Sequence, residues 1–359
     1  MGPSITDDDA VLQHHVENII GSNHIVMPKP DIGPVAWENP GPAAYDFRSD
    51  FVTSPTMEML QAITNCTLQD DTMEEDPTAN SFQNFMAHLT GHEASLLVLS
   101  GTMGNQVALR TALTAPPYSV LADSRSHIIN MEAGGAATLC GALLRGVMPA
   151  NGHHLALDDI KTHACLTTNI YDCPTKVISL ENTLAGTIIP LSDTQAISQW
   201  ARQQNPPIHM HLDGARLWEA VAADPALLKL YCMCFDTVTL CFTKGLGAPL
   251  GSIVVGSQSI ITHACWMRKR LGGGLQQAGI IAAAARVSVT STFLRQKLVD
   301  CHKVAREISE MWLSLGGKIW DNIIDKNCFA ELANKAGIKI MKGKAEDILG
   351  HVTKFDLNS

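Results

Sequence analysis

The stretch PIHMHLDGAR at residues 207–216, followed by TVTLCFTKG at residues 237–245, decides the fold of this chain. Each begins with an apolar run of the length of a buried β-strand. The first run ends at Asp213, and the second leads to Lys244, 31 residues further on. Because ligands bind at the carboxyl ends of strands in α/β proteins, we expect both charged residues at one ligand-binding edge of a sheet.

A lysine and an acid in these positions are the pair that a pyridoxal 5′-phosphate enzyme requires. The lysine amine forms a Schiff base with the cofactor aldehyde, and the carboxylate keeps the pyridine nitrogen protonated so that the ring accepts a carbanion's electrons. Either residue alone would be read as a solvated loop charge. The spacing of Asp213 and Lys244 and the glycines around them favour the catalytic interpretation.

Strand-like and helix-like patterns alternate through the body of the chain, from ASLLVLSG and GNQVALRTALTA to TVTLCFTKG. This alternation predicts βαβ units and an α/β fold with a mostly parallel sheet. Residues 1–45, rich in proline and glycine, are predicted to form an N-terminal arm, and residues 46–293 a large domain. Ala-rich periodicity over 275–312 predicts one long or two consecutive helices that lead into a small domain at 294–359.

Composition narrows the class of protein. The chain has 359 residues, a formal net charge of −9 and a mean hydropathy of +0.07, so we expect neither nucleic acid nor an anionic membrane as a partner. No apolar run approaches the roughly 18 residues of a membrane span. The acidic N-terminus does not resemble a secretory signal, and we expect a soluble, cytoplasmic protein.

The ten cysteines show no disulfide framework and are predicted to be free thiols. Cys232 and Cys234, with His263 and Cys265 further on, leave a zinc site conceivable, but core packing is favoured because the spacing is not that of closed zinc sites. No metal is therefore predicted.

The turn from Ser100 to Asn105 follows an apolar run and opens a helical pattern. Backbone N–H groups at a helix start attract anions, so Gly101, Thr102 and Met103 are candidates for binding the cofactor phosphate. The alternative is an ordinary strand-to-helix turn.

Three more residues qualify by position. His127 could stack on the pyridine ring or handle protons near the substrate. Asn182 follows a predicted strand and could donate to the phenolic oxygen of the cofactor. Arg216 could offer a two-point contact to a substrate carboxylate, or form a surface salt bridge instead.

Several motifs occur in an order that closely resembles the low-specificity threonine aldolase family, whose members are pyridoxal phosphate enzymes of the aspartate aminotransferase fold. The resemblance covers residues 45–293 and rests on the motifs DFRSDFVTSPT, EEDPTAN, GHEASLLVLSGTMGNQVAL, HIINMEAGGAA, ISLENTLAGTIIPL, HLDGARLWEA, CFTKGLGAPLGS and RKRLGGGLQQAG. It implies fold type I with a smaller α+β C-terminal domain, and a homodimer or homotetramer with active sites at the subunit interface.

The resemblance also implies residue roles. Lys244 would hold the cofactor, Asp213 would pair with its nitrogen, Thr102 and its neighbours would bind the phosphate, and His127 would stack on the ring. Ser49 and Arg216 would orient the substrate carboxylate. The implied reaction cleaves L-threonine or L-allo-threonine to glycine and an aldehyde through a quinonoid carbanion.

The chain departs from the family pattern at positions that bear on activity. Leu184 and Ala185 stand where a histidine often follows the ENT motif, and Gln276 stands where an arginine often reaches the phosphate. Lys342 and Lys344 are the nearest counterparts of a C-terminal arginine, and an ammonium cannot reproduce a planar fork. The alternatives are an alanine racemase of the same family, serving peptide biosynthesis, and a non-catalytic homologue, against which the retention of Lys244 and Asp213 argues.

Overall fold

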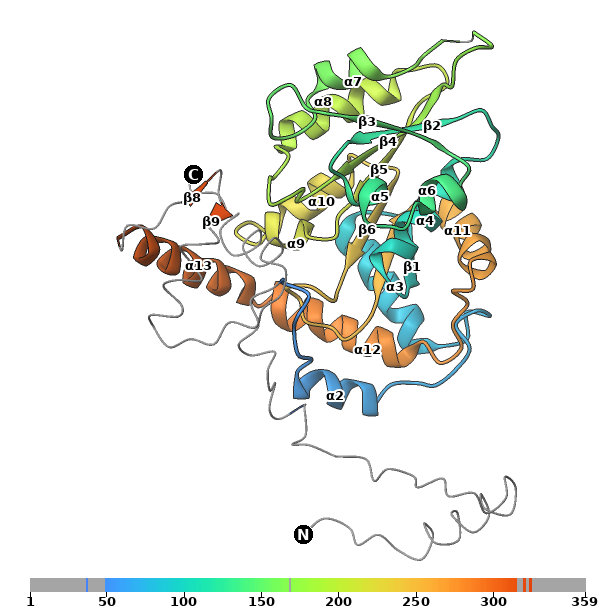
Figure 1. Cartoon of the computed structure of the whole chain (residues 1–359). Coiled ribbons are helices and arrows are strands. Elements are labelled where there is room, and N and C mark those ends of the chain that lie inside the picture. The colour runs from blue at the N-terminus through green and yellow to red at the C-terminus, as the bar shows by residue number, and fades with distance from the viewer. Residues whose placement is uncertain (1–36, 38–48, 168, 315–318, 321–322, 325–359) are drawn as a thin grey trace, which may run out of the picture. The chain divides into compact units, whose positions relative to one another are not determined.

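The computed structural model describes residues 37, 49–167, 169–314, 319–320 and 323–324 (Figure 1). Its centre is a seven-stranded sheet in the order β1-β7-β6-β5-β4-β2-β3, in which β7 runs antiparallel to both of its neighbours and the other pairs are parallel. The strands are β1 (Ala94–Val98), β2 (Ser119–Asp123), β3 (Leu143–Val147), β4 (Thr175–Glu181), β5 (His209–Asp213), β6 (Thr237–Cys241) and β7 (Ser252–Gly256). A separate pair is β8 (Ile319–Trp320) and β9 (Ile323–Ile324).

Helices flank this sheet (Figure 1). They are α2 (Met57–Thr64), α3 (Pro77–Thr90), α4 (Gly101–Ala112), α5 (His127–Asn130), α6 (Gly135–Thr138), α7 (Leu157–His163), α8 (Leu191–Arg202), α9 (Leu217–Ala220), α10 (Leu227–Cys232), α11 (Gln258–Arg270), α12 (Gly279–Val287) and α13 (Lys297–Ser314). A π-helix at Ser288–Phe293 follows α12 directly. Strands and helices thus alternate as predicted, and the α/β fold with a mostly parallel sheet is confirmed.

Alternate residues of the strands pack against helices on opposite faces of the sheet. Leu97 packs into the large core that includes side chains of α3, α8 and α10, whereas Leu96 and Val98 pack into a smaller cluster with α4 and α11. Val254 repeats the pattern on β7, since it faces α4 while its neighbours face the large core. Successive strand residues point to opposite faces, so both sides of the sheet are covered by helices.

Helix α4 begins at the carboxyl end of β1, as predicted. The Ser100 side chain caps it by accepting a hydrogen bond from Met103 N at 3.1 Å. Gly101 and Gly104 let the helix lie against β6: a Cβ at Gly101 would lie 2.6 Å from Cys241 Sγ, and one at Gly104 would lie 2.6 Å from Thr239 Cγ2. This close approach sets the helix start beside the end of β6.

Asp76 joins two helices that are far apart in sequence. It is fully buried and caps α3 by accepting hydrogen bonds from Thr78 N at 2.9 Å and Ala79 N at 3.1 Å. Its second oxygen accepts from Gly279 N, the first residue of α12, at 3.1 Å. Burial opposes the charged form, but hydrogen bonds from the Thr67 hydroxyl and from the backbone N–H groups of Ala79, Gln69 and Gly279 lower the pKa of this carboxyl.

The helical pattern over 275–312 is confirmed by α12, the π-helix and α13. The boundaries at 45/46 and 293/294 stay predictions, and nearly all of the predicted arm and residues 325–359, including Lys342 and Lys344, lie outside the described residues. Among the residues described, no helix is both long and apolar enough to cross a membrane.

The nine described cysteines are free thiols, and Cys328 lies outside the described residues. Cys232 and Cys234 pack into the large core, whereas Cys265 packs at the edge of the cluster between α4 and α11. The structure therefore places the two halves of the conceivable zinc site in different parts of the core.

Candidate active site

A cavity of about 430 Å³ opens at the carboxyl ends of the parallel strands, the edge at which α/β proteins bind ligands. Its wall brings together most of the residues that the sequence singled out. They are Ser49, Gly101, Thr102, His127, Asp213, Arg216 and Lys244.

Three neighbouring strands deliver the charged groups. Glu181 and Asp213 are paired at the last positions of β4 and β5, and Lys244 lies three residues past the end of β6. The Lys244 Nζ is 3.7 Å from Cys241 Sγ. The predicted meeting of Asp213 and Lys244 at one edge of the sheet is confirmed, because parallel pairing brings the carboxyl ends of these strands together.

Asp213 is buried and held from two directions. Its Oδ2 accepts a hydrogen bond from Asn105 Nδ2 at 2.7 Å, and its Oδ1 accepts one from Ala215 N at 3.1 Å. Fixed donors of this kind stabilise a charged carboxylate inside a protein. Asp213 therefore faces the cavity in one orientation.

His127 is the first residue of α5, and its side chain reaches Glu132. The Nδ1 and Glu132 Oε1 are 2.8 Å apart, and this hydrogen bond is the main cause that raises the pKa of His127, against the opposing effect of burial. The donor atoms of His127, Glu132 and Asp213 lie within 4.8 Å of one another, a set of three that could also hold a metal ion.

Glu181 lines the cavity beside Asp213. Its Oε2 accepts a hydrogen bond from the backbone N of His127 at 2.7 Å. Burial, reinforced by the negative charge of Asp213, raises the pKa of Glu181 to about 8. Glu181 therefore holds a proton more readily than an ordinary glutamate does.

Arg216 lies directly before α9 and is paired with Asp50. The Arg216 Nε is 2.6 Å from Asp50 Oδ2, and Nη2 is 2.8 Å from Oδ1. Burial opposes the charged form, but Asp50 prevails and raises the pKa of Arg216. The guanidinium is therefore held at the cavity wall by a carboxylate from the segment that also carries Ser49.

Two predicted residues do not line the cavity. The Met103 N–H is bound by Ser100, and a Cβ at Gly273 would lie 2.6 Å from Met103 Sδ, so this side chain lies against a different loop. Asn182 is buried after β4, where its Oδ1 accepts from Ile189 N at 3.4 Å. Gln276 is exposed and likewise absent from the cavity wall.

The sequence reasoning missed several residues of the site. Asp50, Glu132 and Glu181 each lie within a stretch that was quoted for another residue, and neither their charge nor their position along the chain distinguished them. Asn105 was part of the predicted phosphate turn, but its contact with Asp213 spans 108 positions. Only the fold reveals such contacts.

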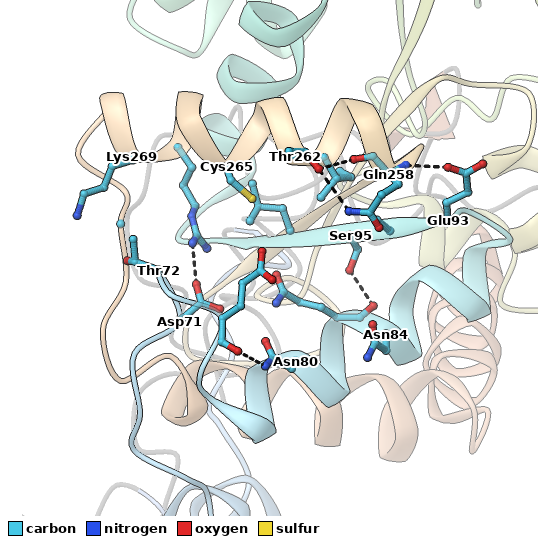
Figure 2. A pocket seen from close by; sticks show the side chains of 17 residues that line it. Asp71, Thr72, Asn80, Asn84, Glu93, Ser95, Gln258, Thr262, Cys265 and Lys269 are labelled. Atoms are coloured by element: carbon cyan, nitrogen blue, oxygen red, sulfur yellow. Dashed lines mark hydrogen bonds and ion pairs between the residues drawn. The ribbon is translucent and has the colours of Figure 1, made fainter.

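A second cavity, of about 370 Å³, lies between α3, β1 and α11 and contains none of the predicted site residues (Figure 2). At its edge Arg268 and Asp71, both buried, form an ion pair at 2.7 Å, and Arg268 Nη1 donates to Leu97 O at 2.7 Å. These contacts tie α11 to β1 and to the loop before α3. We attribute a structural role to this pair.

The donor set of the first cavity fits pyridoxal phosphate. The wall offers a lysine amine, a buried carboxylate held by hydrogen bonds, an imidazole, and a helix start whose first N–H groups have no partner within the helix. The packing at Gly101, where a Cβ would meet Cys241 Sγ at 2.6 Å, keeps that helix start close to the lysine strand.

The fold and the site define an α/β enzyme of the pyridoxal phosphate-dependent lyase class. The sequence profile of the beta-eliminating lyase family matches residues 46–330, and the chain belongs to this family. The resemblance to threonine aldolases inferred from the motifs is thereby confirmed, together with fold type I.

Curated relatives include proteins with two different activities. The chain is 52% identical to the aldolase vrtJ of Penicillium aethiopicum over 79% of its own length and 72% of that protein. It is 42% identical to a probable low-specificity L-threonine aldolase of Schizosaccharomyces pombe, covering 76% of this chain and 71% of the relative. It is 40% identical to the alanine racemase TOXG of Cochliobolus carbonum, covering 85% of this chain and 79% of the relative.

Proposed function

We propose that this lyase cleaves β-hydroxy amino acids, with L-threonine and L-allo-threonine as substrates, to glycine and an aldehyde. The observation that carries the proposal is the presence of Lys244, Asp213, His127 and Arg216 on the wall of one cavity. Similarity to proteins named aldolase and threonine aldolase supports the same reaction.

Pyridoxal phosphate, when bound, supplies an electron sink for a carbanion at the substrate Cα. The Lys244 amine would hold the cofactor through its aldehyde carbon. Asp213, fixed by Asn105 and Ala215, would hold the proton on the pyridine nitrogen. The N–H groups of Gly101 and Thr102 at the start of α4 would bind the phosphate.

The remaining wall residues would handle the substrate. Arg216, oriented by Asp50, and Ser49 would bind the amino-acid carboxylate. His127 holds Glu132 through Nδ1, which leaves Nε2 to accept or return a proton in the cavity. Asn182, which its position after a predicted strand made a candidate for the phenolic oxygen, would need the loop after β4 to shift.

A racemase of the same family is the second candidate. Leu184 is buried, and Ala185 is exposed with a positive φ of 48°, so neither position supplies an imidazole for a substrate hydroxyl. A site without that group suits exchange of the Cα proton of alanine, and the similarity to the racemase TOXG supports this alternative.

Oligomerisation is part of the proposal. Phe51, Met131 and Leu250 line the cavity yet are 63%, 69% and 42% exposed, an apolar rim that a second copy could cover. We infer a cytoplasmic homodimer or homotetramer with shared active sites. Light scattering during size-exclusion chromatography tests the assembly, and a monomer would contradict it.

The decisive experiment incubates the pyridoxal phosphate-loaded protein separately with L-threonine, L-allo-threonine and L-alanine. Acetaldehyde release without D-alanine is the expected result. D-alanine without acetaldehyde would make the enzyme a racemase. A colourless protein with neither product would mark a non-catalytic homologue, and the Lys244→Ala variant is the matched inactive control.

A further inference from the structure

One amide lies between the two acids of the site. Asn105 Nδ2 donates to Asp213 Oδ2 at 2.7 Å and to Glu132 Oε1 at 2.8 Å. All three side chains are at least 95% buried. Asn105 projects from α4, whereas Asp213 ends β5 and Glu132 follows α5, so this amide joins three elements.

His211 fixes the orientation of the Asn105 amide. Since both partners of Nδ2 are carboxylates, Oδ1 must be the acceptor of the remaining contact, with His211 Nε2 at 3.2 Å. His211 therefore carries its proton on Nε2, and its Nδ1 accepts from the Thr237 hydroxyl at 2.9 Å. Complete burial lowers the pKa of His211 to about 4, in keeping with a neutral ring.

The same amide also influences His127 indirectly, through Glu132. Glu132 Oε1 accepts from both Asn105 and His127 Nδ1, while its Oε2 accepts from Gln106 Nε2. Without Asn105, two buried carboxylates would face each other without a shared donor. Glu132 Oε1 would then keep His127 as a partner with one donor fewer, and would attract the imidazolium more strongly.

We propose that Asn105, oriented by His211, is a positioning residue that holds Asp213 and Glu132 through one amide and thereby couples the acid for the pyridine nitrogen to His127. The effect of Asn105 on cofactor binding through Asp213 rests on the proposed function, whereas its effect on His127 through Glu132 does not. Asn105 would act through its neighbours, because it needs no contact with the reacting atoms.

Other charged groups face the same acids and must be considered. Glu181 approaches Asp213 from β4, and Arg216 and Lys244 lie on the cavity wall. Arg216 is paired with Asp50, and the Lys244 amine is 3.7 Å from Cys241 Sγ. Cys241 is a neutral neighbour, because burial raises the pKa of its thiol.

The test compares Asn105→Leu with Gln106→Met, two near-isosteric changes at adjacent buried positions. Gln106→Met removes a donor from Glu132 alone, whereas Asn105→Leu removes one from both acids. The pKa of His127 is measured by NMR of histidine-labelled, ligand-free protein, with the signal assigned by its loss in His127→Gln. The dissociation constant of pyridoxal phosphate is measured by absorbance titration.

Asn105→Leu is expected to raise the pKa of His127 by about one unit or more and to weaken cofactor binding about tenfold. Gln106→Met is expected to shift His127 less and to leave cofactor binding within about threefold of wild type. If Asn105→Leu does not fold by circular dichroism, Asn105→Ser replaces it, because one hydroxyl can satisfy only one of the two acids.

An unchanged His127 titration in the folded Asn105 variant would overturn the proposal, as would equal effects of both variants on cofactor binding. Wild-type protein that does not bind pyridoxal phosphate would contradict the proposed function instead. In that case the ligand-free titration of His127 would still decide the coupling.

Discussion

Asp50 and Arg216 form a two-point ion pair across 166 residues of sequence, with Nε–Oδ2 at 2.6 Å and Nη2–Oδ1 at 2.8 Å. The pair joins the segment before α2 to the end of β5 and holds the guanidinium at the cavity wall. A planar guanidinium makes this contact, and an ammonium cannot reproduce its geometry.

Arg216→Lys should therefore impair binding of the substrate carboxylate more than turnover. We expect KM for the amino acid to rise roughly 10- to 100-fold, the range for loss of a charge-assisted hydrogen bond, with a smaller change in kcat. Steady-state kinetics of the loaded enzyme measure both constants. Arg202→Lys, remote from the cavity, is the matched control, and equal KM values for the two variants would contradict this role.

Glu181→Gln should change how stability depends on pH. The pKa of Glu181 is raised to about 8, so the native state retains a proton that the unfolded chain loses above its ordinary value of 4.5. The contribution is complete below about pH 4.5 and is lost as pH rises through 8, on the order of 5 kcal/mol in all. Glutamine resembles the protonated form and removes this dependence.

The measurement is thermal unfolding of the ligand-free protein from pH 5 to pH 9. Glu181→Gln should be more stable than wild type at the alkaline end and show a flatter profile. The exposed Glu75→Gln serves as control and should run parallel to wild type. A Glu181→Gln profile that also runs parallel would show that Glu181 is charged in the native protein.

Gly101→Ala should weaken cofactor binding through a steric effect. The added Cβ would lie 2.6 Å from Cys241 Sγ, so the start of α4 or the lysine strand must move. We expect about a tenfold or greater rise in the dissociation constant of pyridoxal phosphate, from a shift of roughly 1 Å or less at the phosphate turn. Absorbance titration measures it.

The double variant Gly101→Ala with Cys241→Ala tests the cause, because it removes the colliding sulfur. The affinity of the double variant for pyridoxal phosphate should recover toward that of Cys241→Ala alone. Such non-additive effects are expected for two residues in direct contact. If the losses of affinity in the two single variants add up in the double variant, the effect of Gly101→Ala arises at the helix start itself and not from the collision with the thiol.

His211→Gln should flatten the acid side of the stability profile. Burial lowers the pKa of His211 to about 4, so between its ordinary pKa of 6.5 and 4 the unfolded chain binds a proton that the native state excludes. Stability thus falls as pH drops through this window, by up to about 3 kcal/mol. Denaturant unfolding at pH 4 to 7 measures the slope, and the exposed His153→Gln should leave it unchanged.

Local sequence patterns predicted the strands and the helix start that carry the site, because each of these elements is encoded by residues that are close together in the sequence. Apolar runs identified β5 and β6, and Ser100 with two nearby glycines identified the start of α4. Met103 shows the limit of this reasoning: it belongs to the same turn, but its N–H is bound by Ser100 and its side chain lies against the Gly273 loop. Which side of a turn faces a ligand depends on packing that a turn motif does not encode.

The sequence by itself determined the alternation of strands and helices and placed Asp213 and Lys244 at strand ends, because strand pattern and chain order suffice for both. The tertiary structure alone decided the pairing of Arg216 with Asp50, the raised pKa of Glu181 and the amide of Asn105 shared by two acids. Charge states and hydrogen-bond partners depend on distances and burial, which exist only once segments far apart in sequence are packed together.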